Sequence, residues 1–286
     1  LEELGVAQPD TFRADAILVR DTGNAAVGKP AATVTLRGMV NVVVTMESSS
    51  TELHSGMFGG AAPDALAALV HTLATLRDSD GNTTIDGLES DQVWRGEAYP
   101  QDQFRSDAAI LNGVSILGTG TVSDMLWARP ALTILGIDCP PVVGSAAAIV
   151  PKASARLNLR IPPGVRPESA EAALRARLIS ATPSGIDCVV ETEATGSPFA
   201  AETDGPAYRA FATAMSEAYG VEMTHLGQGG SVPLCNVFDE LYPDAEIILM
   251  GVEEPLALIH APNESVHPNE IASTALAEAL FLQHYA

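Results

Sequence analysis

Polar residues that could do chemistry gather in a few loops of this 286-residue chain. A carboxylate, Asp21, follows the apolar run AILVR, and an imidazole, His260, lies in LIHAPNESVHPNE after the apolar run AEIILMG. Carboxylate and imidazole groups are ligands that suit zinc, manganese or cobalt. Ligands of open α/β sheets bind at the carboxyl ends of the strands, so both residues could share one site. Taken singly, Asp21 also suits a turn or helix cap, and His260 a structural role.

Two further segments carry groups that suit a carboxylate ligand. The turn GQGGSVP contains Gly229, Gly230 and Ser231 and opens a predicted helix, whose first backbone N–H groups can bind an anion. Arg160 lies on a predicted strand, and its guanidinium can bind a carboxylate through two parallel hydrogen bonds. The alternatives are a plain tight turn for the glycines and a solvent-facing strand position for Arg160.

His54 lies in TELHSGMFGG (51–60), a glycine-rich loop that follows a strongly β-branched run. It is either a chemical group in a flexible loop or only a polar residue in a turn. The sequence contains no GxSxG elbow, no HExxH helix and no plausible cysteine nucleophile. This argues against hydrolases that use a serine or cysteine nucleophile or an HExxH zinc site.

The charge of the chain narrows its partners. Fifteen Lys and Arg against 36 Asp and Glu give a formal charge of −21, which would repel the phosphates of nucleic acids and of anionic membranes. We therefore expect neither as a partner, whereas metal ions and small cations remain compatible. An acidic composition can also serve solubility alone.

The three cysteines, Cys139, Cys188 and Cys235, are odd in number and show no CxxC spacing, so neither a disulfide framework nor a thiolate zinc site is indicated. A cytoplasmic location fits best. No apolar run reaches the roughly 18 residues of a membrane span, and the first residues do not resemble a signal peptide.

The middle of the chain predicts an α+β unit. Its elements follow the order β-α-β-β-α-β, which is typical of a split βαβ fold with an antiparallel sheet and two helices on one face. The predicted strands are 33–48, 131–138, 147–164 and 185–194, and the predicted helices are 61–76 and 167–180. Residues 78–128 yield no clear prediction.

The two ends of the chain predict a second unit, of the doubly wound α/β class. A buried strand at 14–21 matches in character the helices and the strand AEIILMG that follow residue 199. We therefore expect three ranges: 1–32 and 199–286 form parts of one α/β domain, and 33–198 is an α+β domain inserted into it.

Several segments together resemble the aminoacylase–carnosinase–carboxypeptidase family of di-zinc metallopeptidases, most closely its dipeptidase branch. The most specific are LHSGMFGG and HAPNE, and the others are ILVRDTGN, TLRGMVNVVVTMES, PKASARLNLRIPPG and GQGGSVP. The resemblance runs from residue 14 to the C-terminus. It implies a zinc-binding α/β domain interrupted by a lid domain of split βαβ type, and a homodimer formed through the lid.

Carried over position by position, the resemblance implies a role for each residue. Asp21 would bind one of two zinc ions and His260 the other, with manganese or cobalt as alternatives. His54 would reach from the lid into the partner subunit's site and hydrogen-bond the developing oxyanion. Arg160 and the turn Gly229–Gly230–Ser231 would hold the C-terminal carboxylate of a small peptide or N-acyl amino acid.

The family's His-x-Asp motif and Glu-Glu pair are not found, and Glu2 and Glu3 lie too near Asp21 to supply that pair. Glu253 and Glu254 are expected to be surface acids. The chain therefore resembles the C-terminal two-thirds of such an enzyme and is expected to be inactive alone. The alternatives are a non-catalytic dimerisation or peptide-binding module derived from such a peptidase and, last, a ferredoxin-like regulatory domain fused to an α/β domain.

Overall fold

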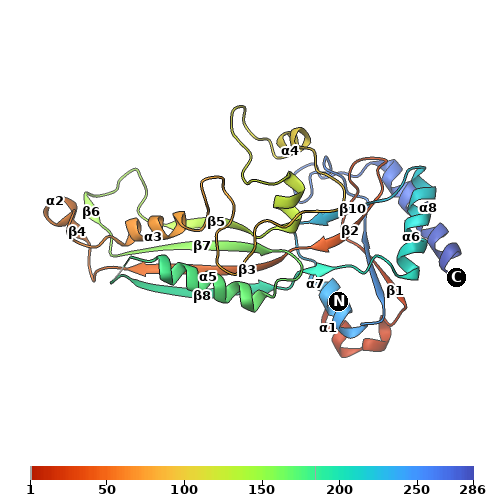
Figure 1. The fold of residues 1–286 in the computed structure, drawn as a ribbon, viewed down its shortest axis with the longest axis horizontal. Helices are drawn as coiled ribbons and strands as arrows, with labels where there is room; N and C mark the ends of the chain where they lie inside the picture. The colour runs from red at the N-terminus through yellow and green to blue at the C-terminus, as the bar shows by residue number, and fades with distance from the viewer. Residues whose placement is uncertain (1, 184) are drawn as a thin grey trace.

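The computed structural model of the protein describes residues 2–183 and 185–286. Two main sheets, each with its own helices, lie one after the other along the long axis of the molecule (Figure 1). We call them the lid sheet and the α/β sheet.

The lid sheet is antiparallel, with the strand order β5-β7-β3-β8. Val40, Val42 and Val44 of β3 are fully buried, whereas the residues between them are half-buried. Successive side chains of a strand point to opposite faces, and here α3 and α5 pack on the buried face. The elements are β3 Gly38–Glu47, α3 Ala65–Ala74, β5 Ala131–Asp138, β7 Lys152–Ile161, α5 Pro167–Ala181 and β8 Asp187–Gly196. This order confirms the predicted split βαβ fold.

Both helices of the lid sheet begin at identifiable sequence signals. The Asp64 side chain accepts a hydrogen bond of 3.1 Å from the Ala67 N–H, so it caps α3. The helix therefore begins four residues later than the predicted 61, after Pro63. Helix α5 begins at Pro167, as predicted, because proline suits the first helical position.

The α/β sheet has the order β1-β11-β2-β10, and β9 also pairs with β2. Alternate residues of β11 enter different cores: Ile248 and Met250 pack with α6 and α8, and Ile247 and Leu249 with α7. Helices thus cover both faces, which confirms the doubly wound class. The elements are α1 Glu2–Ala7, β1 Ala16–Arg20, β2 Ala31–Leu36, β9 Phe199–Ala200, α6 Pro206–Tyr219, β10 Thr224–Gln228, α7 Pro233–Leu241, β11 Glu246–Met250 and α8 Pro268–Tyr285.

Two predicted strands are divided in the structure, and one strand was missed. The predicted strand 147–164 divides into β6 Ala148–Ile149, which pairs outside the lid sheet, and β7 of the lid sheet. The run 33–48 is not one strand: it divides at Arg37 into β2 of the α/β sheet and β3 of the lid sheet. A Cβ at Gly38 would lie 2.4 Å from the Gly196 carbonyl oxygen, so the glycine permits a close approach where the chain changes sheets. Valine and threonine occur on both sides of the break, so composition does not mark it. Strand β10 was missed because THLGQ has no β-branched run.

Residues 78–128, which the sequence left unassigned, form a mostly irregular segment that covers β10. It contains helix α4 Gln101–Asp107 and the π-helix η2 Asp124–Ala128. The buried Asp124 carboxylate accepts hydrogen bonds from the Trp94 N–H at 2.6 Å and the Thr121 N–H at 2.8 Å. Trp127 lies against Gly227 of β10, where a Cβ would be 2.5 Å from the indole. These contacts attach the segment to the α/β sheet.

The end of the lid sheet farthest from the α/β sheet carries a small unit built on two short antiparallel strands from distant parts of the chain. It consists of β4 Leu53–His54, β6 Ala148–Ile149 and the short helix α2 Ser55–Phe58, at the left of Figure 1. Among the described residues, no helix combines the length and apolar character needed to cross a bilayer.

Candidate active site

Asp21 and His260 come to the same edge of the α/β sheet, although they lie near opposite ends of the sequence. Asp21 directly follows β1, and His260 lies in the loop after β11; both are exposed. Burial, then the negative charges of Asp21 and Glu264, raise the pKa of Glu253, and the charge of His260 lowers it. The two predicted metal ligands therefore share one electrostatic environment.

The loops at this edge are held tightly against each other. The Asn24 N–H donates to the Glu253 carbonyl oxygen at 2.7 Å, and a Cβ at Gly251 would lie 1.6 Å from the Thr22 carbonyl oxygen. From α8, the buried Glu270 carboxylate accepts hydrogen bonds from the Asn24 side chain at 2.6 Å and the Gly28 N–H at 2.7 Å. The loop after Asp21 is thus fixed on both sides.

Sequence reasoning missed Glu253 as a member of this edge. The expectation of surface acids is wrong: Glu253 and Glu254 are both half-buried, and the pKa of Glu253 is also raised. The signal was present: Glu253 follows the carboxyl end of β11 as Asp21 follows that of β1. Cys235 also lies within the electrostatic range of Asp21, and burial, then this charge, raises the pKa of its thiol to about 12.

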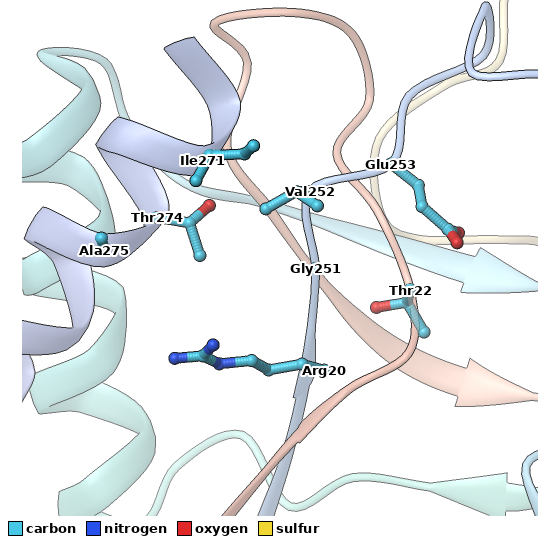
Figure 2. Close-up of a pocket in the computed structure, with 8 residues that line it drawn as sticks. All are labelled: Arg20, Thr22, Gly251, Val252, Glu253, Ile271, Thr274 and Ala275. Atoms are coloured by element: carbon cyan, nitrogen blue, oxygen red, sulfur yellow. The ribbon is translucent and has the colours of Figure 1, made fainter. Parts of the chain in front are cut away.

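Two hollows adjoin the edge. One, of about 350 Å³, lies between the ends of β1 and β11 and helix α8 (Figure 2). Figure 2 shows Arg20 extending toward α8, where it pairs with Glu278, while the Glu253 carboxylate points to the other side, near Thr22. The polar residues that line this first hollow include Thr274 of α8. The Glu253 carboxylate therefore faces away from this hollow.

The second hollow, of about 330 Å³, joins the edge to the end of β10. Glu253 lines one part of it and Gln228 another, and Thr33 of β2 also contributes. Apolar lining comes from Tyr99 and Ile259, among others. This hollow thus runs from Glu253, in the loop after β11, to Gln228, which directly precedes the glycine-rich turn.

Arg160 and the glycine-rich turn meet at a residue that sequence reasoning missed, Arg37. The charge of Arg160 acts on Arg37, and Arg37 Nη2 lies 2.8 Å from where a Cβ would stand at Gly229. Ser231 Oγ lies 4.0 Å from the ideal Cβ position of Gly196. Arg37 had no periodic signal, because it lies at the unpredicted break between β2 and β3.

His54 is not brought to the other candidate residues of its own chain. It lies at the tip of the lid sheet, at the opposite end of the molecule from β1 and α8 (Figure 1). The exposed ring accepts a 3.1 Å hydrogen bond at Nδ1 from the Gly56 N–H. A neutral imidazole that accepts at Nδ1 carries its proton at Nε2, so the outer nitrogen is a hydrogen-bond donor.

The described residues do not by themselves complete a metal site. Asp21 and His260 are suitable donors, but no cluster of three His, Cys, Asp or Glu side chains with metal-binding geometry occurs in residues 2–183 and 185–286. A catalytic zinc site needs three protein ligands. Any metal ion at this edge would therefore need donors in addition to these two.

Comparison with known proteins identifies the middle of the chain. Residues 34–185 match the family model described as the peptidase dimerisation domain of M20 peptidases. The chain is 40% identical over 289 residues to a cysteinylglycine-S-conjugate dipeptidase of Corynebacterium striatum, covering 98% of this chain and 62% of that protein. It is 24% identical to the human β-Ala-His dipeptidase, and the match covers 99% of this chain and 59% of that protein.

Solved structures show the same fold. Human carnosine dipeptidase 1 superposes with a TM-score of 0.77 at 24% identity, covering 100% of this chain and 63% of that one. An M20 family metallo-carboxypeptidase of Sulfolobus solfataricus superposes with a TM-score of 0.79 at 18% identity, and the match covers 99% of this chain and 66% of that one. The chain thus spans roughly three-fifths of the length of the relatives that it matches. Since the family model matches more than half of the chain, the protein belongs to the M20 peptidases, in their dipeptidase branch.

Proposed function

We propose that the protein is the larger part of a metal-dependent peptidase that hydrolyses dipeptides or N-acyl amino acids in the cytoplasm. The observation that supports the proposal is that Asp21 and His260 follow neighbouring parallel strands and both act electrostatically on Glu253, beside a hollow that extends to Gln228. The names of the relatives, among them dipeptidases for Cys-Gly and β-Ala-His, support this substrate class.

Asp21 and His260 would each hold one of two metal ions, zinc first and manganese or cobalt as alternatives. When bound, such ions polarise a carbonyl and lower the pKa of a coordinated water. The general base and the remaining ligands would come from polypeptide corresponding to the part of the relatives that these 286 residues do not match. On this proposal the chain alone is inactive.

Arg160 and the turn Gly229–Gly230–Ser231 would bind the substrate's C-terminal carboxylate at the far end of the hollow. The guanidinium supplies charge and paired donors, and the turn precedes α7, whose N-terminus favours an anion. A substrate held at its carboxylate would present its scissile carbonyl toward Asp21 and His260.

His54 would act in the site of a second copy. Its Nε2–H is free to donate, and it stands at the end of the molecule farthest from its own Asp21. The lid sheet also offers a surface for a homodimer: within the described residues β5 pairs on one side only, and its Ile134, Leu135 and Ile137 are exposed. Exposed edge strands pair readily with other strands.

The experiment uses this chain alone and fused to the unmatched N-terminal part of the Corynebacterium striatum dipeptidase. We expect the fusion to hydrolyse cysteinylglycine with zinc or manganese, to lose activity with a chelator, and to be inactive as His260→Ala. The chain alone should show no hydrolysis. Activity that survives complete metal removal would contradict the proposal.

Coexpression tests the role of His54 in the same fusion. His54→Ala alone should lower the rate by about 10²–10³, because one oxyanion donor is removed. Mixed dimers of His54→Ala and His260→Ala should regain one working site. No regain at all would mean that His54 does not act across subunits.

A second candidate is a non-catalytic dimerisation or peptide-binding module. The match of residues 34–185 to a dimerisation domain and the exposed β5 edge favour it. It predicts a stable dimer of this chain and no metal-dependent hydrolysis by the fusion.

A further inference from the structure

Arg37 is a buried cation without a counter-charge. It lies at the break between β2 and β3, its residue is 8% exposed, and its Nε and Nη1 are buried with no hydrogen-bond partner. No ion pair in the described part of the chain includes it. This is unusual in a chain with a formal charge of −21.

The surroundings of Arg37 increase its need for an anion. Arg160, a second cation, lies near enough that its charge adds to burial in lowering the pKa of Arg37 to about 10. Gly229 also lies close to the end of the Arg37 side chain, and it has no side chain that could bind the guanidinium. The Arg37 backbone N–H donates to the Gln228 carbonyl oxygen at 3.1 Å, which places the residue beside the end of the second hollow.

Another buried arginine shows that this fold can supply partners. Arg129 is 6% exposed, and its Nε donates to the Gln92 carbonyl oxygen at 2.8 Å while the Asp124 carboxylate lies within electrostatic range. Burying an unpaired charge is strongly unfavourable, so structures normally pair or solvate it. Arg37 departs from this pattern where the candidate substrate site lies.

We infer that Arg37 is a second carboxylate-binding residue, which forms with Arg160 a two-guanidinium site for the C-terminal carboxylate of a peptide ligand. The identity of the ligand rests on the proposed function. Glycine at position 229 leaves the approach to Arg37 Nη2 open, since a side chain there would meet it. The bound carboxylate supplies the counter-charge that the chain itself lacks at this place.

Thermal unfolding of the full chain with two probes tests the inference. Glycylglycine has the carboxylate, and glycylglycinamide lacks it. We expect glycylglycine, but not the amide, to raise the Tm of the wild-type chain. Arg37→Met should raise the Tm of the unliganded chain, because an unpaired buried cation is removed, and should weaken glycylglycine binding by about tenfold or more.

The matched control is Arg129→Met, which removes a buried guanidinium that has partners. It should lower the Tm and leave the glycylglycine-induced shift unchanged, whereas Arg160→Met should lose that shift. An Arg37→Met chain that unfolds at lower temperature and still responds fully to glycylglycine would overturn the inference, since Arg37 would then be a structural arginine.

Nuclear magnetic resonance of the wild-type chain gives a readout that needs no variant. The Arg37 Nε–H signal should shift on addition of glycylglycine and stay in place with the amide; no shift with either would also overturn the inference. The proposed function fails separately. If the fusion hydrolyses cysteinylglycine but glycylglycine and glycylglycinamide bind equally well, only the inference about Arg37 is wrong. If binding depends on the carboxylate but the fusion hydrolyses nothing, only the proposed function is wrong.

Discussion

The lid sheet and the α/β sheet are held together in different ways. In the lid sheet β3 pairs with β7 along all ten of its residues, and one core lies under both helices. In the α/β sheet β11 joins β2 through a single residue pair, Leu249 and Thr33, and the core is divided between two faces. The lid sheet is thus continuous, whereas the α/β sheet consists of two laddered pairs, β1 with β11 and β2 with β10, joined by that single residue pair, so side chains must hold the two pairs together.

This difference matters for the candidate site. Asp21 and His260 lie in loops that follow β1 and β11, a strand pair that one residue pair joins to β2, so packing and buried hydrogen bonds must fix their positions relative to β2 and β10. His54 stands instead at the end of the continuous ladder. A substitution in one region should therefore loosen that region and leave the other intact.

The largest expected effect comes from Phe211→Ala in the α/β core. Phe211 is fully buried and its ring lies 6.0 Å from that of Phe281, so truncation should cost about 3–5 kcal/mol. Hydrogen exchange should accelerate in α6, α8 and β11 but not in β3 and β7. The matched control, Leu174→Ala in the fully buried face of α5, should give the reverse pattern. If either substitution accelerated hydrogen exchange equally in both sheets, the two regions would not be independently stabilised, which would contradict this account.

A smaller effect is expected from Glu270→Gln. The carboxylate accepts hydrogen bonds from Asn24, Gly28 and the Tyr219 hydroxyl. A Gln amide can accept hydrogen bonds with only one oxygen, so the free energy of unfolding should fall by on the order of 1–3 kcal/mol. Chemical denaturation measures it. Glu47→Gln, which breaks the exposed 2.8 Å pair with Lys152 on the lid sheet, is the control and should cost roughly 0–1 kcal/mol. Equal losses would show that the loop after Asp21 does not depend on Glu270.

The smallest effect, about 1 kcal/mol, is expected from Asp124→Asn in the segment over β10. Burial opposes the charge of Asp124, but hydrogen bonds from Trp94 and Thr121 outweigh it and lower its pKa from the ordinary 3.8. The folded state therefore resists protonation, and this stabilisation is present at neutral pH and lost as the pH falls below 3.8. The free energies of unfolding of the wild-type chain and of Asp124→Asn should converge as the pH is lowered from neutral to acidic. A difference that stays constant with pH would contradict this account.

Much of the fold was predictable because its signals are local. Alternating valines in 38–47 and the proline that starts the helix at 167 each describe their own element. The missed features are non-local: the break at Arg37 depends on the approach of Gly196 to Gly38, and the half-burial of Glu253 depends on the loop after Asp21 packing against it. No window of sequence contains both members of such a contact.

By itself, the sequence determined the fold class, the order of the elements and the family, because periodicity, turn residues and motif spacing are properties of the chain. It also indicated Asp21, His54, Arg160, the Gly229–Ser231 turn and His260 as candidates. Only the tertiary structure decided which of these groups meet. It brought Asp21 and His260 within electrostatic range of Glu253 and Arg160 within range of Arg37, and it placed β4, which carries His54, at the far end of the molecule, because these relations depend on neighbours that folding brings from distant parts of the chain.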